Sequence, residues 1–314
     1  MSKFPAYPAL LLLAVILSAA ACTGKNENPD KAVKGTINRE IIDRAGRTVI
    51  INGPINRIVS TAPSNTEIIV DLGLADKLVA VDRYSTDVQE LPSGITYIDF
   101  SYPDAEAILR LAPDIIIANG HNTTGSGEDP FRLLKEMGLP VAYISMSIDI
   151  NGIYEDIAFM ADLLSVKDSG DALILSMKKQ VNELTERTAQ VKTRRSVYLE
   201  LSAAPEIFTF GKNSYINDMI SAVGGRNIFE NDNWVISPST EAIIERNPDV
   251  ILTCVDYLED PIGELKSRDG FNHISAVINN RIYQIDTNSL VRPSSRIMLA
   301  LNQMAKAIYP EVYE

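Results

Sequence analysis

The chain holds few residues that could perform catalysis. Its histidines are His121 and His273, and neither the His-Glu-x-x-His pattern of zinc proteases, the Gly-x-Ser-x-Gly turn of hydrolases nor the Gly-x4-Gly-Lys phosphate loop occurs. A zinc or manganese site usually needs several histidines together with carboxylates. We therefore expect no metal site, no resident cofactor and no enzymatic activity.

A different chemistry is favoured by loops that follow predicted strands, because ligands of parallel sheets bind beyond the carboxyl ends of the strands. These loops mix aromatic residues with a few polar ones, which suits a large amphipathic ligand with flat apolar faces. The candidate ligand-binding residues are Tyr84, Phe100, Asn119, His121, Phe208, Trp234, Asn288 and Arg292.

Explanations that involve no ligand remain open for most of these residues. Core packing explains each aromatic residue equally well, except Trp234, whose polar loop Asn231-Asp-Asn would leave an indole exposed. A loop histidine without function is the alternative for His121, and a surface ion pair is the alternative for Arg292.

Two glutamates occupy matching places in a repeated pattern. Glu106-Ala-Ile precedes Pro113-Asp-Ile-Ile, and Glu241-Ala-Ile precedes Pro248-Asp-Val-Ile at the same spacing, about 135 residues later. Each acid falls in the first turn of a predicted helix, where the helix dipole alone could explain it. Alternatively, two equivalent acids could dock on a two-fold symmetric partner that presents basic pockets.

The repeat predicts two lobes of one architecture, with strands and helices alternating as in parallel α/β proteins. Ser64-Asn-Thr-Glu67 has the spacing of a capping box, and Asp129-Pro130 that of a helix N-cap followed by proline. Apolar residues at helical spacing over 169–192 predict one long helix that joins the lobes across a ligand cleft. A surface helix of a single lobe is the alternative.

The N-terminus predicts the compartment. Lys3 precedes an apolar run that is short for a membrane span, and Ala19-Ala20-Ala21-Cys22 resembles a lipoprotein cleavage site, with Ala19 where leucine is usual. We expect a signal peptide over 1–21, an acylated Cys22 and a flexible polar tether over 22–37. An ordinary signal peptide with an incidental cysteine is the alternative. The lobes are predicted over 38–165 and 193–314, and the joining helix over 166–192.

The formal net charge of −12 argues against a nucleic acid partner. Cys254 alone remains after Cys22, so no intramolecular disulfide is available to the mature chain.

Several motifs together resemble the substrate-binding lipoproteins of bacterial ABC importers for cobalamin, ferric siderophores and haem. The similarity begins near Ile37 and runs to the C-terminus. Its motifs are Asp43-x-x-Gly-Arg47, Arg57-Ile-Val-Ser-x-Ala-Pro-Ser-Asn-Thr-Glu67, both Pro-Asp-Ile/Val-Ile units, Gly211-Lys-Asn-Ser, Gly224-Gly-Arg-Asn-Ile and Arg292-Pro-Ser-Ser-Arg296.

The resemblance implies two Rossmann-like lobes joined by one long helix, and it implies that Glu106 and Glu241 engage a permease dimer that works with an ATPase. It places the candidates above, His121 excepted, at ligand-contacting positions of the cobalamin binder. Phe100 and Asn119 stand where that binder has tryptophans, Asn288 replaces an acid, and Trp234 aligns only with a one-residue insertion after it.

The expected protein is a monomeric, lipid-anchored, extracytoplasmic receptor that hands cobalamin or a related corrinoid to the permease. A ferric siderophore is the second candidate ligand. Haem is the third, with His121 or Tyr84 as an iron ligand. An enzyme of the same shape and a surface protein that binds only other proteins are the rival classes; turnover of a small substrate would favour the former.

Overall fold

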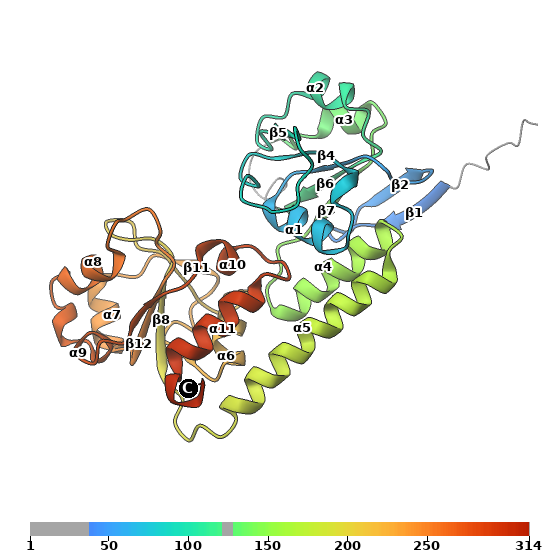
Figure 1. Cartoon of the computed structure of the whole chain (residues 1–314). Helices are drawn as coiled ribbons and strands as arrows, with labels where there is room; N and C mark the ends of the chain where they lie inside the picture. The colour runs from blue at the N-terminus through green and yellow to red at the C-terminus, as the bar shows by residue number, and fades with distance from the viewer. Residues whose placement is uncertain (1–37, 121–127, 314) are drawn as a thin grey trace, which may run out of the picture. The chain divides into compact units, whose positions relative to one another are not determined.

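The computed structural model describes residues 38–120 and 128–313, and two parallel sheets organise them (Figure 1). The N-terminal sheet has the strand order β5-β4-β3-β6-β7, and the C-terminal sheet has the order β10-β8-β12-β13. Every strand pair within these two sheets is parallel. The predicted α/β class with parallel sheets is confirmed.

The strands of the two sheets are short. The N-terminal sheet contains β3 (Ile58–Ser60), β4 (Leu78–Asp82), β5 (Thr96–Ile98), β6 (Ile115–Asn119) and β7 (Val141–Ile144). The C-terminal sheet contains β8 (Ser196–Glu200), β10 (Arg226–Asn227), β12 (Val250–Thr253) and β13 (Ile282–Gln284). Two antiparallel pairs stand apart: β1 (Asn38–Ile42) with β2 (Thr48–Asn52), and β9 (Thr209–Phe210) with β11 (Val235–Ile236).

Helices connect the strands in both halves. Before the C-terminal sheet come α1 (Pro63–Asp71), α2 (Ala105–Arg110), α3 (Arg132–Glu136), α4 (Ile150–Leu163) and α5 (Lys167–Thr188). After β8 come α6 (Tyr215–Ala222), α7 (Thr240–Arg246), α8 (Pro261–Ser267), α9 (Ser275–Ile278), α10 (Thr287–Val291), α11 (Ile297–Ile308) and α12 (Pro310–Tyr313). Short 3-10 turns cover Ala75–Lys77 and Phe271–His273.

The repeated sequence pattern forms the same unit twice. Helix α2 leads into β6, which lies between β3 and β7, and helix α7 leads into β12, which lies between β8 and β13. The apolar strands β6 and β12 are buried along almost their whole length. This is what the fully apolar Pro-Asp-Ile/Val-Ile runs predict for central strands of a parallel sheet covered on both faces.

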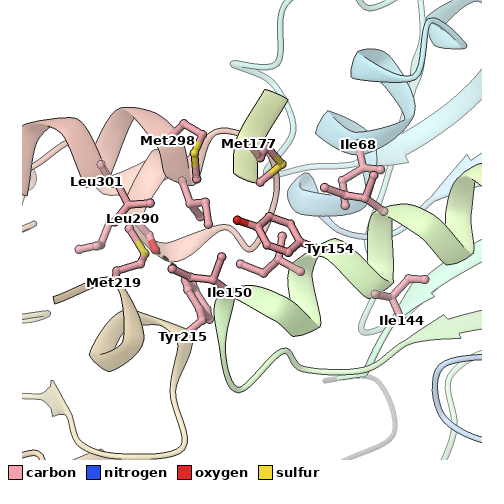
Figure 2. Packing of buried hydrophobic residues seen from close by; sticks show 14 of the residues in the cluster. Ile68, Ile144, Ile150, Tyr154, Met177, Tyr215, Met219, Leu290, Met298 and Leu301 are labelled. Atoms are coloured by element: carbon pink, nitrogen blue, oxygen red, sulfur yellow. Dashed lines mark hydrogen bonds between the residues drawn. The ribbon is translucent and has the colours of Figure 1, made fainter. Parts of the chain in front are cut away.

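Apolar packing continues from one sheet to the other. Ile115 and Ile117 of β6 face the same cluster as Val250 and Leu252 of β12, whereas Ile116 faces a separate cluster beneath α2 and α3. The shared cluster also takes residues from α1, α4, α5, α6 and α11, among them Ile68, Met177 and Leu301 (Figure 2). Burial of this continuous apolar surface therefore holds the two sheets in one folded unit.

The long helix predicted between the sheets is present as α5, which has 22 residues. It ends at Thr188, so Val191, counted in the sequence pattern, lies beyond it. Helix α5 packs against α4 on one side and against α6 and α11 on the other. The approach to α4 is close, because a Cβ atom on Gly170 would lie 2.3 Å from the Cβ atom of Ala161.

Two local helix-start predictions are wrong. Helix α1 begins at Pro63 with Ala62 as its N-cap, and Glu67 is fully buried instead of closing a capping box with Ser64. Helix α3 begins at Arg132, after the position expected from Asp129-Pro130. The equivalent pair in the second unit behaves as the pattern suggests, since Asp260 caps α8 and accepts a hydrogen bond of 2.8 Å from the backbone N–H of Gly263.

The predicted signal peptide, tether and Cys22 lie outside the described residues. Within residues 38–120 and 128–313, no helix combines the length and apolar character needed to cross a membrane.

Candidate functional site

The carboxyl end of β4 presents the first candidate residue. Asp82, the last residue of β4, is fully buried and accepts hydrogen bonds from the backbone N–H of Tyr84 (2.8 Å) and from the hydroxyl of Ser85. Burial raises the pKa of Asp82, and these hydrogen bonds partly offset the rise. The turn after β4 is therefore held from beneath by a buried carboxyl group.

Tyr84 and Phe100 form an aromatic pair at this end of the sheet. Their ring centroids lie 6.0 Å apart, and Tyr84 is 52% exposed. The guanidinium of Arg83 lies 5.2 Å from the centre of the Tyr84 ring and forms an ion pair of 2.9 Å with Asp99. Asn119, the last residue of β6, ends at the same edge of the sheet. Parallel pairing thus gathers Tyr84, Phe100 and Asn119, three of the predicted ligand residues, at the carboxyl ends of the strands.

The C-terminal half contributes a second aromatic pair, and only one of its members was a predicted candidate. Trp234 contacts Phe210 edge to face at 6.3 Å, whereas the predicted Phe208 lies two residues earlier and is 37% exposed. Trp234 is partly buried and has a φ of 58°, a left-handed conformation that is unusual for a bulky side chain. Backbone strain of this kind concentrates at functional sites, which adds weight to Trp234.

A close backbone approach at Gly211 holds the Trp234 loop. Its N–H donates to the carbonyl of Trp234 (2.7 Å), and the N–H of Lys212 donates to the carbonyl of Asp232 (2.8 Å). A Cβ atom on Gly211 would lie 2.1 Å from that Asp232 oxygen. Only glycine fits here without displacing the backbone, which explains the glycine of the Gly211-Lys-Asn-Ser motif.

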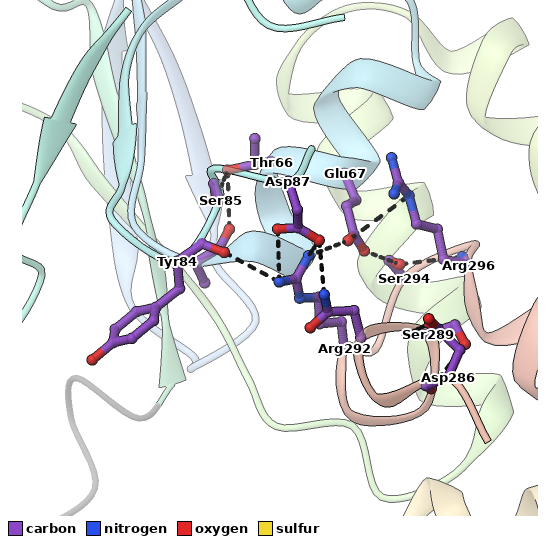
Figure 3. A network of polar contacts seen from close by, with 12 residues as sticks. Thr66, Glu67, Tyr84, Ser85, Asp87, Asp286, Ser289, Arg292, Ser294 and Arg296 are labelled. Carbon is purple, nitrogen blue, oxygen red and sulfur yellow. Dashed lines mark hydrogen bonds and ion pairs between the residues drawn. The ribbon is translucent and has the colours of Figure 1, made fainter. Parts of the chain in front are cut away.

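Asn288 and Arg292 reach across to the N-terminal half, where both donate hydrogen bonds to Asp87. Figure 3 shows the contact between Arg292 and Asp87. Arg292 also donates to the carboxylate of Glu67 at 2.9 Å and to the carbonyl oxygen of Tyr84 at 3.1 Å. The second oxygen of Glu67 accepts from the hydroxyl of Ser294 at 2.6 Å. Tyr84, Asn288 and Arg292 are therefore brought together, as the ligand-site prediction requires. Hydrogen bonds within the chain hold them there.

The pKa values of the ionisable groups in this network shift in different directions, because the groups differ in burial and in their partners. Burial raises the pKa of Glu67, although hydrogen bonds from Ser294 and Arg292 oppose that shift. Partial burial would raise the pKa of Asp87 as well, but the hydrogen bonds and positive charge of Arg292 outweigh it and lower the pKa. For Arg292 itself, burial is outweighed by the two acids, so its pKa is raised. The guanidinium therefore stays charged.

Sequence reasoning missed Glu67 and Asp87 as parts of this region. Glu67 lies in an otherwise apolar stretch, Glu67-Ile-Ile-Val, and an acid there is a weak signal of a buried partner. A cavity of about 350 Å³ adjoins the network and is lined by Asp71, Asp87, Asp286, Asn288, Ser289, Ser295, Arg296, Met298 and Leu299.

The two repeated glutamates lie on the surface at equivalent positions. Glu106 follows the N-cap Asp104 of α2, and its side chain is 88% exposed with an ion pair of 3.7 Å to Arg110. Glu241 follows the N-cap Ser239 of α7 and is also exposed. The pKa of Glu241 is lowered, because its own backbone N–H and the Ser239 hydroxyl donate to the carboxylate.

Other candidate chemistry is not assembled. Burial raises the pKa of the Cys254 thiol to about 12, so this cysteine is inert at neutral pH. In the part of the chain that the structure describes, no three acidic, histidine or cysteine residues form a group able to hold a metal ion. His121 lies outside the described residues.

Comparison with known proteins decides the family. The family model for periplasmic binding proteins matches residues 58–288, which is most of the chain. The chain belongs to this family. It is thus an extracytoplasmic solute-binding protein rather than an enzyme, and the resemblance read from the sequence motifs is confirmed.

Individual relatives and solved structures match most of this chain. An uncharacterized ABC transporter substrate-binding lipoprotein of Bacillus subtilis, YvrC, is 28% identical over 310 residues, 98% of this chain and 97% of that protein. The vitamin B12-binding protein of Vibrio campbellii is 27% identical over 261 residues, 81% of this chain and 90% of that protein. A crystal structure of a possible iron-binding, periplasmic solute-binding protein of Staphylococcus epidermidis has a TM-score of 0.73 at 29% identity, over 81% of this chain and 99% of that one.

Proposed function

We propose that this periplasmic binding protein captures cobalamin or a related corrinoid and delivers it to the permease of an ABC importer. The vitamin B12-binding relative and the ABC transporter lipoprotein, each matched over most of the chain, support the assignment. In the proposed arrangement the lobes 38–165 and 193–314, joined by the helix segment 166–192, hold the ligand between them.

The observation that carries the proposal is the set of aromatic rings at strand ends. Tyr84 with Phe100 and Trp234 with Phe210 present two ring pairs, one in each half of the chain. Flat apolar faces of a macrocycle pack well against such rings, and a few polar groups at the rim, Asn119 and Asn288 among them, would meet its amide side chains.

Delivery requires a docking surface, and the equivalent acids Glu106 and Glu241 suit it. Both are exposed, and both occupy the second position of their helices, α2 and α7, which hold corresponding places beside the two sheets. A permease dimer with two-fold symmetry presents the same basic pocket twice. Glu106 can therefore engage one pocket and Glu241 the other. The permease would act together with its ATPase.

The proposal includes a lipid anchor. Acylation of Cys22 would attach a monomeric protein to the outer side of the cell membrane, and the polar segment 22–37 would act as its tether. Mass spectrometry of the protein from membranes tests this directly: a diacylglyceryl adduct on Cys22 is expected. An unmodified chain that starts elsewhere would contradict the anchor without touching the ligand assignment.

A thermal-shift panel tests the ligand. Cobalamin at 100 times its dissociation constant should stabilise the native protein by about 2.7 kcal/mol, because it binds only the folded state. Trp234→Ala and Tyr84→Ala should reduce the shift, whereas Tyr283→Ala, which alters a tyrosine of strand β13, should keep a shift of the same size over its own baseline. A shift with ferric citrate, a ferric siderophore or haem, and none with corrinoids, would transfer the assignment.

An iron-containing ligand is the second candidate, and one observation favours it. Tyr84 places an exposed phenol at the edge of the sheet, and tyrosine oxygen is a known ligand of haem iron. The structural similarity to the possible iron-binding protein of Staphylococcus epidermidis points the same way. Haem binding through Tyr84 would give a Soret band that Tyr84→Phe shifts, and an unchanged spectrum would refute that role.

A further inference from the structure

Arg292 has almost no hydrogen-bonding capacity left for a ligand. Its Nη1 atom donates to Glu67 (2.9 Å) and Asp87 (3.0 Å), and its Nη2 atom donates to Asp87 (2.9 Å) and to the carbonyl oxygen of Tyr84 (3.1 Å). A guanidinium has five N–H groups, so these contacts use four of them. The residue is also only 9% exposed.

Tyr84 is held by its backbone on both sides. Its N–H donates to Asp82 at the end of β4, and its carbonyl oxygen accepts from Arg292. The ring points away from Arg292 (Figure 3). Fixing both polar groups of the residue fixes the plane of its two peptide bonds, and with them the direction in which the ring leaves the backbone.

The same guanidinium ties this turn to two further parts of the molecule. Glu67 belongs to α1 and is fully buried, and Arg292 belongs to the segment between α10 and α11. Asn288, from α10, donates a further hydrogen bond of 2.8 Å to Asp87. The turn over residues 83–87 therefore has a fixed position relative to the C-terminal half as well as to its own sheet.

We propose that Arg292 is a positioning residue: it sets the orientation of Tyr84, and so of the Tyr84–Phe100 ring pair, without contacting the ligand. The consequence for binding rests on the proposed function, but the positioning itself is a property of the ligand-free protein. This inference replaces the direct ligand contact that the sequence resemblance implied for Arg292.

The test is Arg292→Lys in the full mature chain, with Arg268→Lys as the matched control. Lysine keeps the charge but has a single nitrogen, which cannot reach Glu67, Asp87 and the Tyr84 carbonyl together. Arg268 is an equally buried arginine, paired with the buried Glu200, but all its partners lie within the C-terminal half. It therefore reports what loss of a buried guanidinium does by itself.

Hydrogen exchange of the ligand-free proteins gives the first readout. Arg292→Lys should accelerate amide exchange over residues 83–88 about ten-fold or more, because the turn opens more often, while Arg268→Lys should leave that segment at the wild-type rate. Equal exchange in all three proteins, or equal acceleration by both substitutions, would overturn the positioning role. This readout needs no ligand, so it is independent of the proposed function.

Affinity gives the second readout, measured with whichever of cobalamin, ferric citrate or haem stabilises the wild-type protein. Arg292→Lys should weaken binding about ten-fold, and Arg268→Lys less than two-fold, at a temperature where both are folded. Weaker binding with unchanged exchange would make Arg292 a direct contact and overturn the proposal. If Arg292→Lys does not fold, Asp87→Asn keeps the Glu67 pair and should show the same exchange pattern.

Discussion

Replacing Gly211 by alanine should displace the loop that carries Trp234. The added Cβ atom would lie 2.1 Å from the carbonyl oxygen of Asp232, 2.6 Å from its carbonyl carbon and 2.9 Å from the carbonyl oxygen of Phe229. All three are backbone atoms, so no side-chain rotation can relieve the conflict. Carbon and oxygen approach to about 3.3 Å in favourable contacts, and the two segments must therefore separate by about 1.2 Å.

That separation sets the expected loss of stability. It breaks or lengthens the backbone hydrogen bonds from Gly211 to Trp234 and from Lys212 to Asp232, each worth about 1 kcal/mol. Residual overpacking adds about 1–2 kcal/mol. We expect a loss of about 2–4 kcal/mol in the free energy of unfolding, which lowers the Tm by roughly 5–12 °C for a protein of this size.

Circular dichroism melting and tryptophan emission measure the two effects separately. Trp234 is the single tryptophan of the chain, so a shifted emission maximum in folded Gly211→Ala reports the displaced loop. Gly152→Ala is the control, because its nearest neighbour outside the helix backbone would be 3.2 Å away and belongs to a side chain; its stability should change by less than about 1 kcal/mol. A Gly211→Ala protein that melts and emits like this control would refute the reasoning.

Three further predictions address docking, ligand contact and acid stability. Glu106→Ala combined with Glu241→Ala should abolish uptake of the ligand by cells while leaving ligand affinity within two-fold of the wild-type value. The control Glu245→Ala, on the same helix α7, should change neither uptake nor affinity. Loss of affinity in the double variant would place the two acids in the ligand site. Emission of Trp234 should change when the ligand that stabilises the protein is added, and an unresponsive spectrum would remove Trp234 from the site. Burial would raise the pKa of Asp129, but hydrogen bonds from Lys135, Tyr143 and the Phe131 N–H outweigh it and lower the pKa below its ordinary value of 3.8. Ionised Asp129 thus stabilises the fold above pH 4, and Asp129→Asn should cost on the order of 1 kcal/mol at pH 7. Acid-unfolding curves should show this cost shrinking as the pH falls through the lowered pKa of Asp129, and a cost that is the same at every pH would contradict this.

The repeated units were predictable because their signals are local. A helix that starts with an acid, a Pro-Asp break and a run of branched apolar residues can be read within about 15 residues, and both copies became a helix followed by a buried central strand. Ligands of parallel sheets bind beyond the carboxyl ends of the strands, so the same pattern predicted a ligand site near both strand ends. The 14-residue helix α4 was not predicted, although the carboxylate of Asp149 caps it by accepting a hydrogen bond of 2.7 Å from the N–H of Gly152.

Glu67 shows why local patterns can mislead. Its spacing from Ser64 matches a capping box, yet the carboxylate turns inward because a stronger partner arrives from 225 residues away. A buried acid is stable only when hydrogen-bonded and charge-paired, and Arg292 with Ser294 supplies both. The capping interpretation considers only neighbours in sequence, so it could not anticipate this competition.

Short-range patterns were enough to predict the α/β class, the two copies of the α–β unit and the place of Glu106 and Glu241 in the first turns of their helices, since these features depend on local periodicity and helix-start signals. The folded chain was needed to show that Phe210 is the ring that pairs with Trp234. It was also needed to show that Arg292 donates its hydrogen bonds to Glu67, Asp87 and the Tyr84 carbonyl oxygen. Those contacts are set by how segments distant in the chain pack against one another, which no local pattern encodes.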